Sequence, residues 1–489
     1  MAGISRYFFR QAEYWGKSFF AVCTALILAP MLTGFLVALP APIGAVTGIM
    51  TCGLCFFAVC FGLFAKSSQL PAGLRCSPRI CALRQVAFTK HASSGRDLVI
   101  YCGVTDHKWN AELLTIEGVG GSEEAVIYLC RELAKLGWNV TVYNNCGSNP
   151  LTDQEWQPAH NDSKAKGTNN DLRQGAVTYR PYWEWNYRDK QDVIIFWRFV
   201  GRFNVELNCP KIFFDLHDCV SEHDFSDWQL ARISKIFVKS NFHRSLLADI
   251  PDEKFAIIPN GLDFSLLETD PPIKKDRYLM INTSSPDRSM DVLPKLFREV
   301  KKRVPQAKLQ WAYGWEGFET RFAHDVDKLA WMKQSQKEMV EAGIEALGRL
   351  TQAEVGQLYQ RASILAYPTE FWETDCISVK KAQAAYCKPV ATDFGALEES
   401  ICEGVKVALA EKKCRKESRF CFGLEDEQAQ QEWVDAVVAN LTSRWDETVR
   451  CRFRDTAYRV DEARSLDQWV RQLEWPKIAA RWHEILAQP

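Results

Sequence analysis

The loop before residue 378 combines acidic and small residues in a pattern that could hold a hydroxylated, phosphorylated ligand. It follows an apolar stretch, Ile364–Tyr367, which has the composition of a buried strand, and a helix is expected to start near Ser378. Ligands bind at the carboxyl ends of such strands in α/β units. The loop leaves Glu373 and several backbone N–H groups at a helix start, where phosphate oxygens are stabilised.

The residues on either side of this loop predict one complete strand–helix unit. Thr351 and Glu354 have the spacing of a capping box, which predicts a helix start at Thr351. Residues 389–391 predict the next strand, and a turn is expected at 393–395. Strand, loop, helix and strand in this order are typical of a parallel α/β fold.

A glycine turn, Gly118-Val119-Gly120-Gly121, lies between a strand expected at 97–102 and an amphipathic helix that ends at Gly137. Glycines allow a close approach of the backbone, so Gly120 and Gly121 could hold phosphate, or the segment could be a simple turn. A dinucleotide fingerprint would need a third glycine where Glu123 stands, which weakens a nicotinamide interpretation.

Two further side chains could act in chemistry. His217 follows a strand expected at 211–214, near the edge where sites form, although a lone histidine is more often structural. Its spacing to Cys219 and His223 matches no common zinc pattern. Arg288 could bind phosphate through its planar fork, or it could be a surface arginine. The Asp325-Val326-Asp327 segment imitates a metal motif, but no strand precedes it, so we predict no metal site.

Alternating strands and helices continue on both sides of a proline-rich linker at 270–275. We therefore predict an α/β protein with two doubly wound, Rossmann-like domains, at 96–270 and 271–425. The pattern from 426 to 489 is helical, and we expect these helices to pack back across the domains.

Composition narrows the class of protein. The chain has 489 residues, a formal net charge of −1 and 47% hydrophobic residues, enough for two or three domains. Near-neutral charge argues against nucleic acid as a partner. The 17 cysteines show no disulfide framework, so reduced thiols are expected.

The N-terminus predicts a membrane anchor. Uncharged apolar runs at about 19–39 and 45–65 are each long enough to span a bilayer, so residues 1–66 are expected to form a helical hairpin. Basic residues precede the first run, and the linker 67–95 is also basic. Both ends are therefore expected to face the cytosol, with the linker either on anionic headgroups or solvated.

The segments 118–143, 235–263 and 345–401 together resemble glycosyltransferase family 4, whose members have the retaining GT-B fold. Glu373, Ala382-Gln383-Ala384-Ala385 and Lys388-Pro389-Val390 match the nucleotide-sugar site of the family. The chain departs at Lys381, where the family has a second Glu that usually holds the nucleotide ribose. An arginine common in the family is also missing near Ser284.

The resemblance implies roles for named residues. Glu373 and His217 would orient the donor sugar, and Arg288 would stabilise charge on the departing nucleotide. The implied donor-binding residues are Gly120, Gly121, Ser284, Arg288, Glu373, Cys376, Ile377, Ser378 and Lys381.

The function expected from this resemblance is a membrane-anchored transferase that moves a sugar, with retention, from a nucleotide sugar to a glycan or a lipid-linked acceptor. It needs no metal and no cofactor beyond the nucleotide sugar. Three alternatives remain open: a catalytically decayed GT-B scaffold, a nucleotide-sugar epimerase and a glycan phosphorylase. The sugar, the nucleotide, the acceptor and the oligomeric state are also open.

Overall fold

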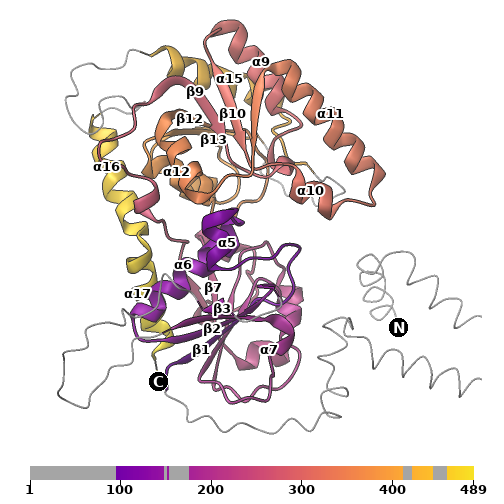
Figure 1. Ribbon diagram of the computed structural model, residues 1–489, viewed down its shortest axis with the longest axis vertical. Coiled ribbons are helices and arrows are strands. Elements are labelled where there is room, and N and C mark those ends of the chain that lie inside the picture. The colour runs from indigo at the N-terminus through magenta and orange to yellow at the C-terminus, as the bar shows by residue number, and fades with distance from the viewer. Residues whose placement is uncertain (1–94, 148–150, 153–175, 411–420, 444–459, 489) are drawn as a thin grey trace, which may run out of the picture. The chain divides into compact units, whose positions relative to one another are not determined.

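The computed structural model describes residues 95–147, 151–152, 176–410, 421–443 and 460–488 (Figure 1). No helix within these ranges is long and apolar enough to cross a membrane. The two expected spans, 19–39 and 45–65, lie outside the described residues, as does the basic linker except for Gly95. The predicted hairpin therefore stays a prediction.

The first domain is built on an eight-stranded sheet in the order β3-β4-β2-β1-β5-β6-β7-β8. All neighbouring strands are parallel except β3, which runs antiparallel to β4 at one edge. The strands are β1 Asp97–Tyr101, β2 Asn139–Asn144, β3 Leu151–Thr152, β4 Val177–Pro181, β5 Val193–Trp197, β6 Lys211–Asp215, β7 Ile233–Val238 and β8 Phe255–Ile257.

Apolar side chains cover both faces of this sheet, because successive residues of a strand point to opposite sides. In β1, Leu98 and Ile100 pack on one face, and Val99 and Tyr101 pack on the other. The first face carries α5 and α6, and the second carries the loops around α7 and α8. The helices are α5 Ala111–Ile116, α6 Gly121–Lys135, α7 Asp227–Arg232 and α8 Asn241–Ser245.

The second domain has a six-stranded, fully parallel sheet in the order β11-β10-β9-β12-β13-β14. The strand order reverses on either side of β9, as in doubly wound folds. The strands are β9 Asp276–Asn282, β10 Lys308–Ala312, β11 Ile344–Gly348, β12 Ala362–Tyr367, β13 Lys388–Thr392 and β14 Val405–Val407.

Helices cover both faces of the second sheet. Met280 of β9 packs with α9, α11 and α15, whereas its neighbours Leu279 and Ile281 pack with α12, α13 and α16. The helices are α9 Leu293–Arg303, α10 Glu316–Arg321, α11 Val326–Ala342, α12 Gln352–Arg361, α13 Ile377–Ala384, α14 Leu397–Ser400, α15 Glu427–Thr442 and α16 Val460–Val470.

The predicted strands and the two doubly wound sheets are confirmed, with two refinements. The edge strand β3 is antiparallel, which the sequence did not indicate. The helix α15 buries Trp433 in the core of the second sheet, so this domain extends beyond the expected boundary at 425.

The last helix, α17 Trp475–Leu486, returns to the first domain and packs against α6. Trp482 stacks on Phe237 of β7, with the two ring centroids 3.6 Å apart. Gly261 lies beneath Trp475, since a Cβ at Gly261 would come within 2.4 Å of the indole. The chain therefore passes between the domains twice, once after β8 and once between α16 and α17.

Candidate active site

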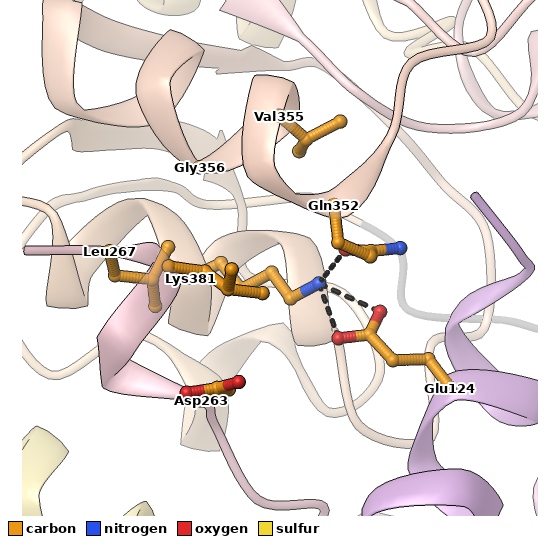
Figure 2. Close-up of a pocket in the computed structure, with 8 residues that line it drawn as sticks. Glu124, Asp263, Leu267, Gln352, Val355, Gly356 and Lys381 are labelled. Atoms are coloured by element: carbon orange, nitrogen blue, oxygen red, sulfur yellow. Dashed lines mark hydrogen bonds and ion pairs between the residues drawn. The ribbon is translucent and has the colours of Figure 1, made fainter. Parts of the chain in front are cut away.

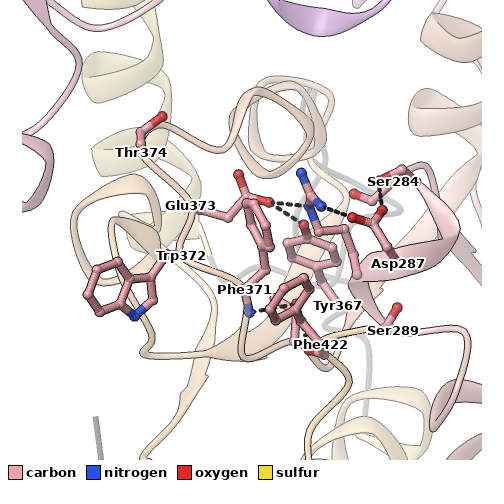
Figure 3. A network of polar contacts seen from close by, with 12 residues as sticks. Ser284, Asp287, Ser289, Tyr367, Phe371, Trp372, Glu373, Thr374 and Phe422 are labelled. Atoms are coloured by element: carbon pink, nitrogen blue, oxygen red, sulfur yellow. Dashed lines mark hydrogen bonds and ion pairs between the residues drawn. The ribbon is translucent and has the colours of Figure 1, made fainter. Parts of the chain in front are cut away.

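Two of the site residues expected in the second domain, Ser284 and Glu373, lie near each other after strands β9 and β12 (Figure 3). Tyr367 ends β12 and donates a hydrogen bond to the carboxylate of Glu373, with 2.5 Å between the oxygens. Arg288 ends a 3-10 turn that follows β9, and its Nε lies 3.4 Å from Oε1 of Glu373. The structure therefore brings together Glu373 and Arg288, which are 85 residues apart in the sequence.

Arg288 is held as a cation. Burial opposes its charge, but the carboxylates of Asp287 and Glu373 outweigh burial and raise the pKa of Arg288 above its usual value. Its guanidinium carbon also lies 3.3 Å from the ring centroid of Phe371. A half-buried, permanent positive charge near the end of a parallel strand suits phosphate oxygens, provided that the arginine exchanges a carboxylate partner for them.

Ser284 lies beside this cluster but contributes through its backbone. It is buried, and its carbonyl oxygen accepts a hydrogen bond of 3.0 Å from the indole N–H of Trp311. The backbone N–H of Ser284 donates to the side chain of Asn282. Ser284 therefore shapes the turn after β9.

The start of α13 closely follows Glu373 in the sequence. Cys376 is its cap residue, and within the described part of the chain no side chain caps this helix. Among the first amides are those of Ile377 and Ser378, which the sequence singled out. Uncapped N–H groups at a helix start bind anions.

The glycine turn of the first domain lies against the second domain. Gly118 has a left-handed φ of +71°, and a Cβ there would come within 2.4 Å of the carbonyl oxygen of Leu350. Gly120 caps α6 without a side chain. A Cβ at Gly121 would lie 3.5 Å from Cδ1 of Ile377. The turn thus brings the start of α6 up to the start of α13.

His217 is held by a charged network that the sequence did not reveal. Its Nε2 lies 2.9 Å from Oδ2 of Asp215, and Oδ1 of Asp215 lies 2.5 Å from Nζ of Lys239. All three side chains are at most 5% exposed. Burial alone would raise the pKa of Asp215, but Lys239 and His217 outweigh it and lower the pKa to about 2.

The protonation of His217 follows from this network. Burial lowers the pKa of His217, so the ring is neutral at neutral pH. The ionised Asp215 can only accept a hydrogen bond, so Nε2 carries the proton and Nδ1 is an acceptor. Nδ1 has no hydrogen-bond partner among the described residues. It can therefore accept a hydrogen bond from a hydroxyl.

The loop that carries Glu373 also contacts the segment around His217. The hydroxyl of Thr374 donates to the carbonyl of His217 at 2.9 Å, and the hydroxyl of Ser240 donates to the carbonyl of Thr374 at 2.8 Å. The two domains therefore bring His217 and Glu373 to one interface.

Arg198 is a second residue that the sequence did not indicate. It follows β5 with a left-handed φ of +65°, which is strained for a residue with a side chain. Its guanidinium holds Asp218 through two hydrogen bonds of 2.6 and 2.7 Å, and it lies 3.6 Å from Glu123. It thereby ties the loop of His217 to the first turn of α6.

Lys381 is already paired in this structure. Its Nζ lies 2.7 Å from both carboxylate oxygens of Glu124 and 2.8 Å from the side-chain oxygen of Gln352 (Figure 2). Glu124 belongs to α6 of the first domain, so this pair joins the two domains. Lys381 therefore contacts a carboxylate of the other domain.

The structure does not bring the Asp325-Val326-Asp327 segment, or His217 with Cys219 and His223, into an arrangement that could hold a metal ion. Asp325 caps α11 by accepting from the backbone N–H of Lys328. The side chain of His223 is 85% exposed, and the thiol of Cys219 contacts the carbonyl of Trp372. In the described ranges no group of three or more His, Cys, Asp or Glu is placed to hold a metal ion.

Comparison with known proteins confirms the resemblance. The sequence model of Glycosyltransferase Family 4 matches residues 119–266. A crystal structure of a glycosyltransferase from Rickettsia africae ESF-5 has a TM-score of 0.50 and 12% identity, covering 81% of this chain and 98% of that chain. This likeness shows the two-domain GT-B fold.

Two other solved structures are slightly less similar. HepE from Anabaena in complex with UDP-glucose has a TM-score of 0.49 and 13% identity, covering 80% of this chain and 99% of that chain. Sucrose-phosphate synthase from Thermosynechococcus elongatus has a TM-score of 0.48 and 11% identity, covering 80% of this chain and 98% of that chain. No curated protein matches this chain by sequence.

Proposed function

We propose that this chain, a family 4-like protein of GT-B fold, transfers a sugar from a nucleoside-diphosphate sugar to a glycan or a lipid-linked acceptor. The observation that carries the proposal is the pairing of Arg288 with Glu373 at the carboxyl end of the second sheet, 3.4 Å apart. The family match over residues 119–266 adds a glycosyltransferase context to that geometry.

The donor diphosphate would occupy the uncapped N-terminus of α13, with Arg288 as its second positive partner. Both stabilise the negative charge that develops on the departing nucleotide. The carboxylate of Glu373 would then exchange its contact with Arg288 for the hydroxyls of the donor sugar. This assignment accounts for leaving-group charge without a metal ion, which is why we propose metal-independent transfer.

The transfer is proposed to retain the anomeric configuration, as the resemblance implies. His217 would accept a hydrogen bond from the sugar through Nδ1, because its Nε2 proton is bound to Asp215. Acceptor attack on the same face as the departing nucleotide requires no nucleophile from the protein, and we name none. The contacts of Thr374 and Ser240 close the interface and help to exclude water.

We also propose that residues 1–66 anchor the protein in a membrane, with the catalytic domains on the cytosolic side. The proposal rests on the two apolar runs and on the basic residues that flank them. It places the site near lipid-linked acceptors. If the full chain is extracted from membranes by alkaline carbonate, this anchoring is wrong.

A thermal unfolding experiment tests the donor site. The full chain is heated with UDP, GDP or ADP in turn. A ligand at 100 times its dissociation constant adds about 2.7 kcal/mol to the free energy of unfolding. We expect one nucleotide to raise the midpoint by several degrees, and Arg288→Ala to remove the increase. The control is Arg303→Ala, because Arg303 forms an exposed ion pair with Asp435 elsewhere in the same domain.

One observation favours a decayed scaffold. Lys381 replaces the family glutamate and is bound to Glu124. If the protein is such a scaffold, no nucleotide will raise the unfolding midpoint of the wild type or of the Lys381→Glu variant. An epimerase would instead convert a nucleotide sugar when no acceptor is added, which product analysis detects.

A further inference from the structure

The side chain of Glu399 in the second domain binds the backbone of the first domain. Glu399 lies in α14, and its Oε2 accepts hydrogen bonds from the backbone N–H and the side-chain amide of Asn241, at 2.9 and 2.8 Å. Its Oε1 accepts from the backbone N–H of Phe242 at 2.6 Å. These two N–H groups open α8, where the helix itself supplies no partner for them. Both oxygens of one carboxylate therefore hold the neighbouring domain.

Helix α14 is fixed to the loop of Glu373. The backbone N–H of Ala396 donates a hydrogen bond of 2.9 Å to the carbonyl oxygen of Glu373. Gly395 has a left-handed φ of +60°, and a Cβ there would lie 3.0 Å from the same oxygen. The side chain of Gln383 in α13 donates to the carbonyl of Ser400 at 2.8 Å. The second domain therefore holds α14, α13 and the loop of Glu373 together as one support.

The residues that Glu399 binds directly follow the support of His217. Lys239 lies two residues before Asn241 and forms the buried ion pair with Asp215, which in turn holds His217. Since only one residue separates them, Asn241 cannot move far without Lys239. The position of α8 on the second domain therefore determines where His217 lies relative to that domain.

An aromatic contact beside Glu399 adds a close fit between α8 and the second domain. The ring of Phe242 meets the indole of Trp372 edge-on, with the centroids 5.6 Å apart. A Cβ at Gly395 would lie 3.4 Å from Cε1 of Phe242, which is ordinary van der Waals contact. Trp372 immediately precedes Glu373 in the loop (Figure 3). A displacement of α8 therefore breaks the hydrogen bonds of Glu399 and this packed contact together.

We infer that Glu399 is a positioning residue that holds the first domain in register on the second and so sets the distance between His217 and Glu373. The inference rests on the proposed function, in which these two side chains orient one sugar from opposite domains. Glu399 acts through the backbone of α8 rather than through a contact with the donor. The pair of Glu124 and Lys381 joins α6 to α13, so the domains are held at two separate places and rotation between them is restricted.

Hydrogen exchange at a second point of the interface tests this role. The backbone N–H of Asn260 donates a hydrogen bond of 2.8 Å to Asp375 of the second domain, a contact in which Glu399 takes no part. The full chain and its Glu399→Ala variant are exchanged in deuterated buffer, and peptides covering Asn241, Phe242 and Asn260 are measured by mass spectrometry. Loss of hydrogen bonds to a charged group corresponds to about a tenfold change in an equilibrium constant. We therefore expect about tenfold faster exchange at all three amides. Faster exchange at Asn241 and Phe242 alone would show a local cap and overturn the inference.

Two further variants separate positioning from loss of charge. Glu399→Gln removes the charge, which also acts on the buried Lys380, but keeps one acceptor oxygen for the N–H groups of α8. It should restore part of the slow exchange at Asn260. Equal exchange in Glu399→Gln and Glu399→Ala would assign the effect to charge, against the inference. Glu398→Ala changes the neighbouring exposed residue of the same helix and should leave the exchange at Asn260 unchanged.

Nucleotide binding distinguishes a failure of this inference from a failure of the proposed function. The nucleotide that raises the unfolding midpoint of the wild type should raise that of Glu399→Ala by a similar amount, because Arg288 and the start of α13 both belong to the second domain. Loss of that increase would place Glu399 in the nucleotide site and contradict a positioning role. If no nucleotide raises the midpoint of the wild type, the proposed function fails, and the exchange at Asn260 still decides whether Glu399 holds the domains in register.

Discussion

Two buried lysine–carboxylate pairs of this protein differ in what they connect. Asp215 ends β6 and Lys239 directly follows the neighbouring strand β7, so their contact is independent of domain motion. Lys381 and Glu124 belong to different domains, so their contact breaks whenever the domains part. The first pair fixes a site residue, His217, whereas the second can respond to a ligand. Similar chemistry therefore gives a rigid support in one place and a separable contact in the other.

The largest expected effect comes from breaking the pair within the first domain. Asp215→Asn leaves the ammonium of Lys239 buried without a counter-ion, which costs about 3–5 kcal/mol of unfolding free energy. Urea unfolding measures the loss. Adding Lys239→Met should recover most of it, because no uncompensated charge then remains. Asp435→Asn, at an exposed pair, should change stability by less than about 0.5 kcal/mol.

The unfolding free energy of the first domain is also expected to depend on pH, through His243. Burial, then Lys239 and His217, lower the pKa of His243 to about 3, against 6.5 in the unfolded chain. Between these values only the unfolded state binds the proton, so stability falls as pH falls. His243 contributes a slope of about 1.4 kcal/mol per pH unit. His243→Gln cannot titrate and should lower the slope of the unfolding free energy between pH 6.5 and 4.5 by about that amount, whereas His217, whose pKa is also lowered by burial, keeps titrating in the variant. Parallel curves for wild type and variant would contradict this origin.

Breaking the pair between the domains should have a smaller effect. Lys381→Met leaves Glu124 without its cation, but the domains can separate and let water reach the carboxylate. We expect a loss of about 1–2 kcal/mol, below the range for a fully trapped ion. Hydrogen exchange should increase in α6 and α13, and Lys308→Met, at an exposed pair, is the control. A loss as large as that of Asp215→Asn would show that the domains cannot part.

Sequence patterns predicted those parts of the molecule that depend on neighbouring residues. The capping box of Thr351 and Glu354 starts α12 as expected, and the apolar runs became strands within one or two residues. These features depend on local hydrogen bonds and on side-chain alternation, which a short segment already contains.

The networks around the candidate site could not be predicted in the same way. Asp215 meets Lys239 only because β6 and β7 are neighbours in the sheet, and strand order is not visible in either segment. Glu124 and Lys381 are 257 residues apart and meet only when both domains are assembled. The one sequence signal for the contact of Asp215 with Lys239 was a charged residue at the end of each of two apolar strands.

Helix α17, which returns to the first domain, affects the order in which the two domains can fold during synthesis. Trp482 and Trp475 complete the core of the first domain, yet they follow the whole second domain in the sequence. During synthesis the second domain therefore emerges in full while Phe237 still lacks its stacking partner. Domains often fold in the order of their synthesis. Here the core of the first domain is completed only after the second domain has been synthesised. A chain released before residue 475 therefore lacks the tryptophans that cover one face of the first sheet.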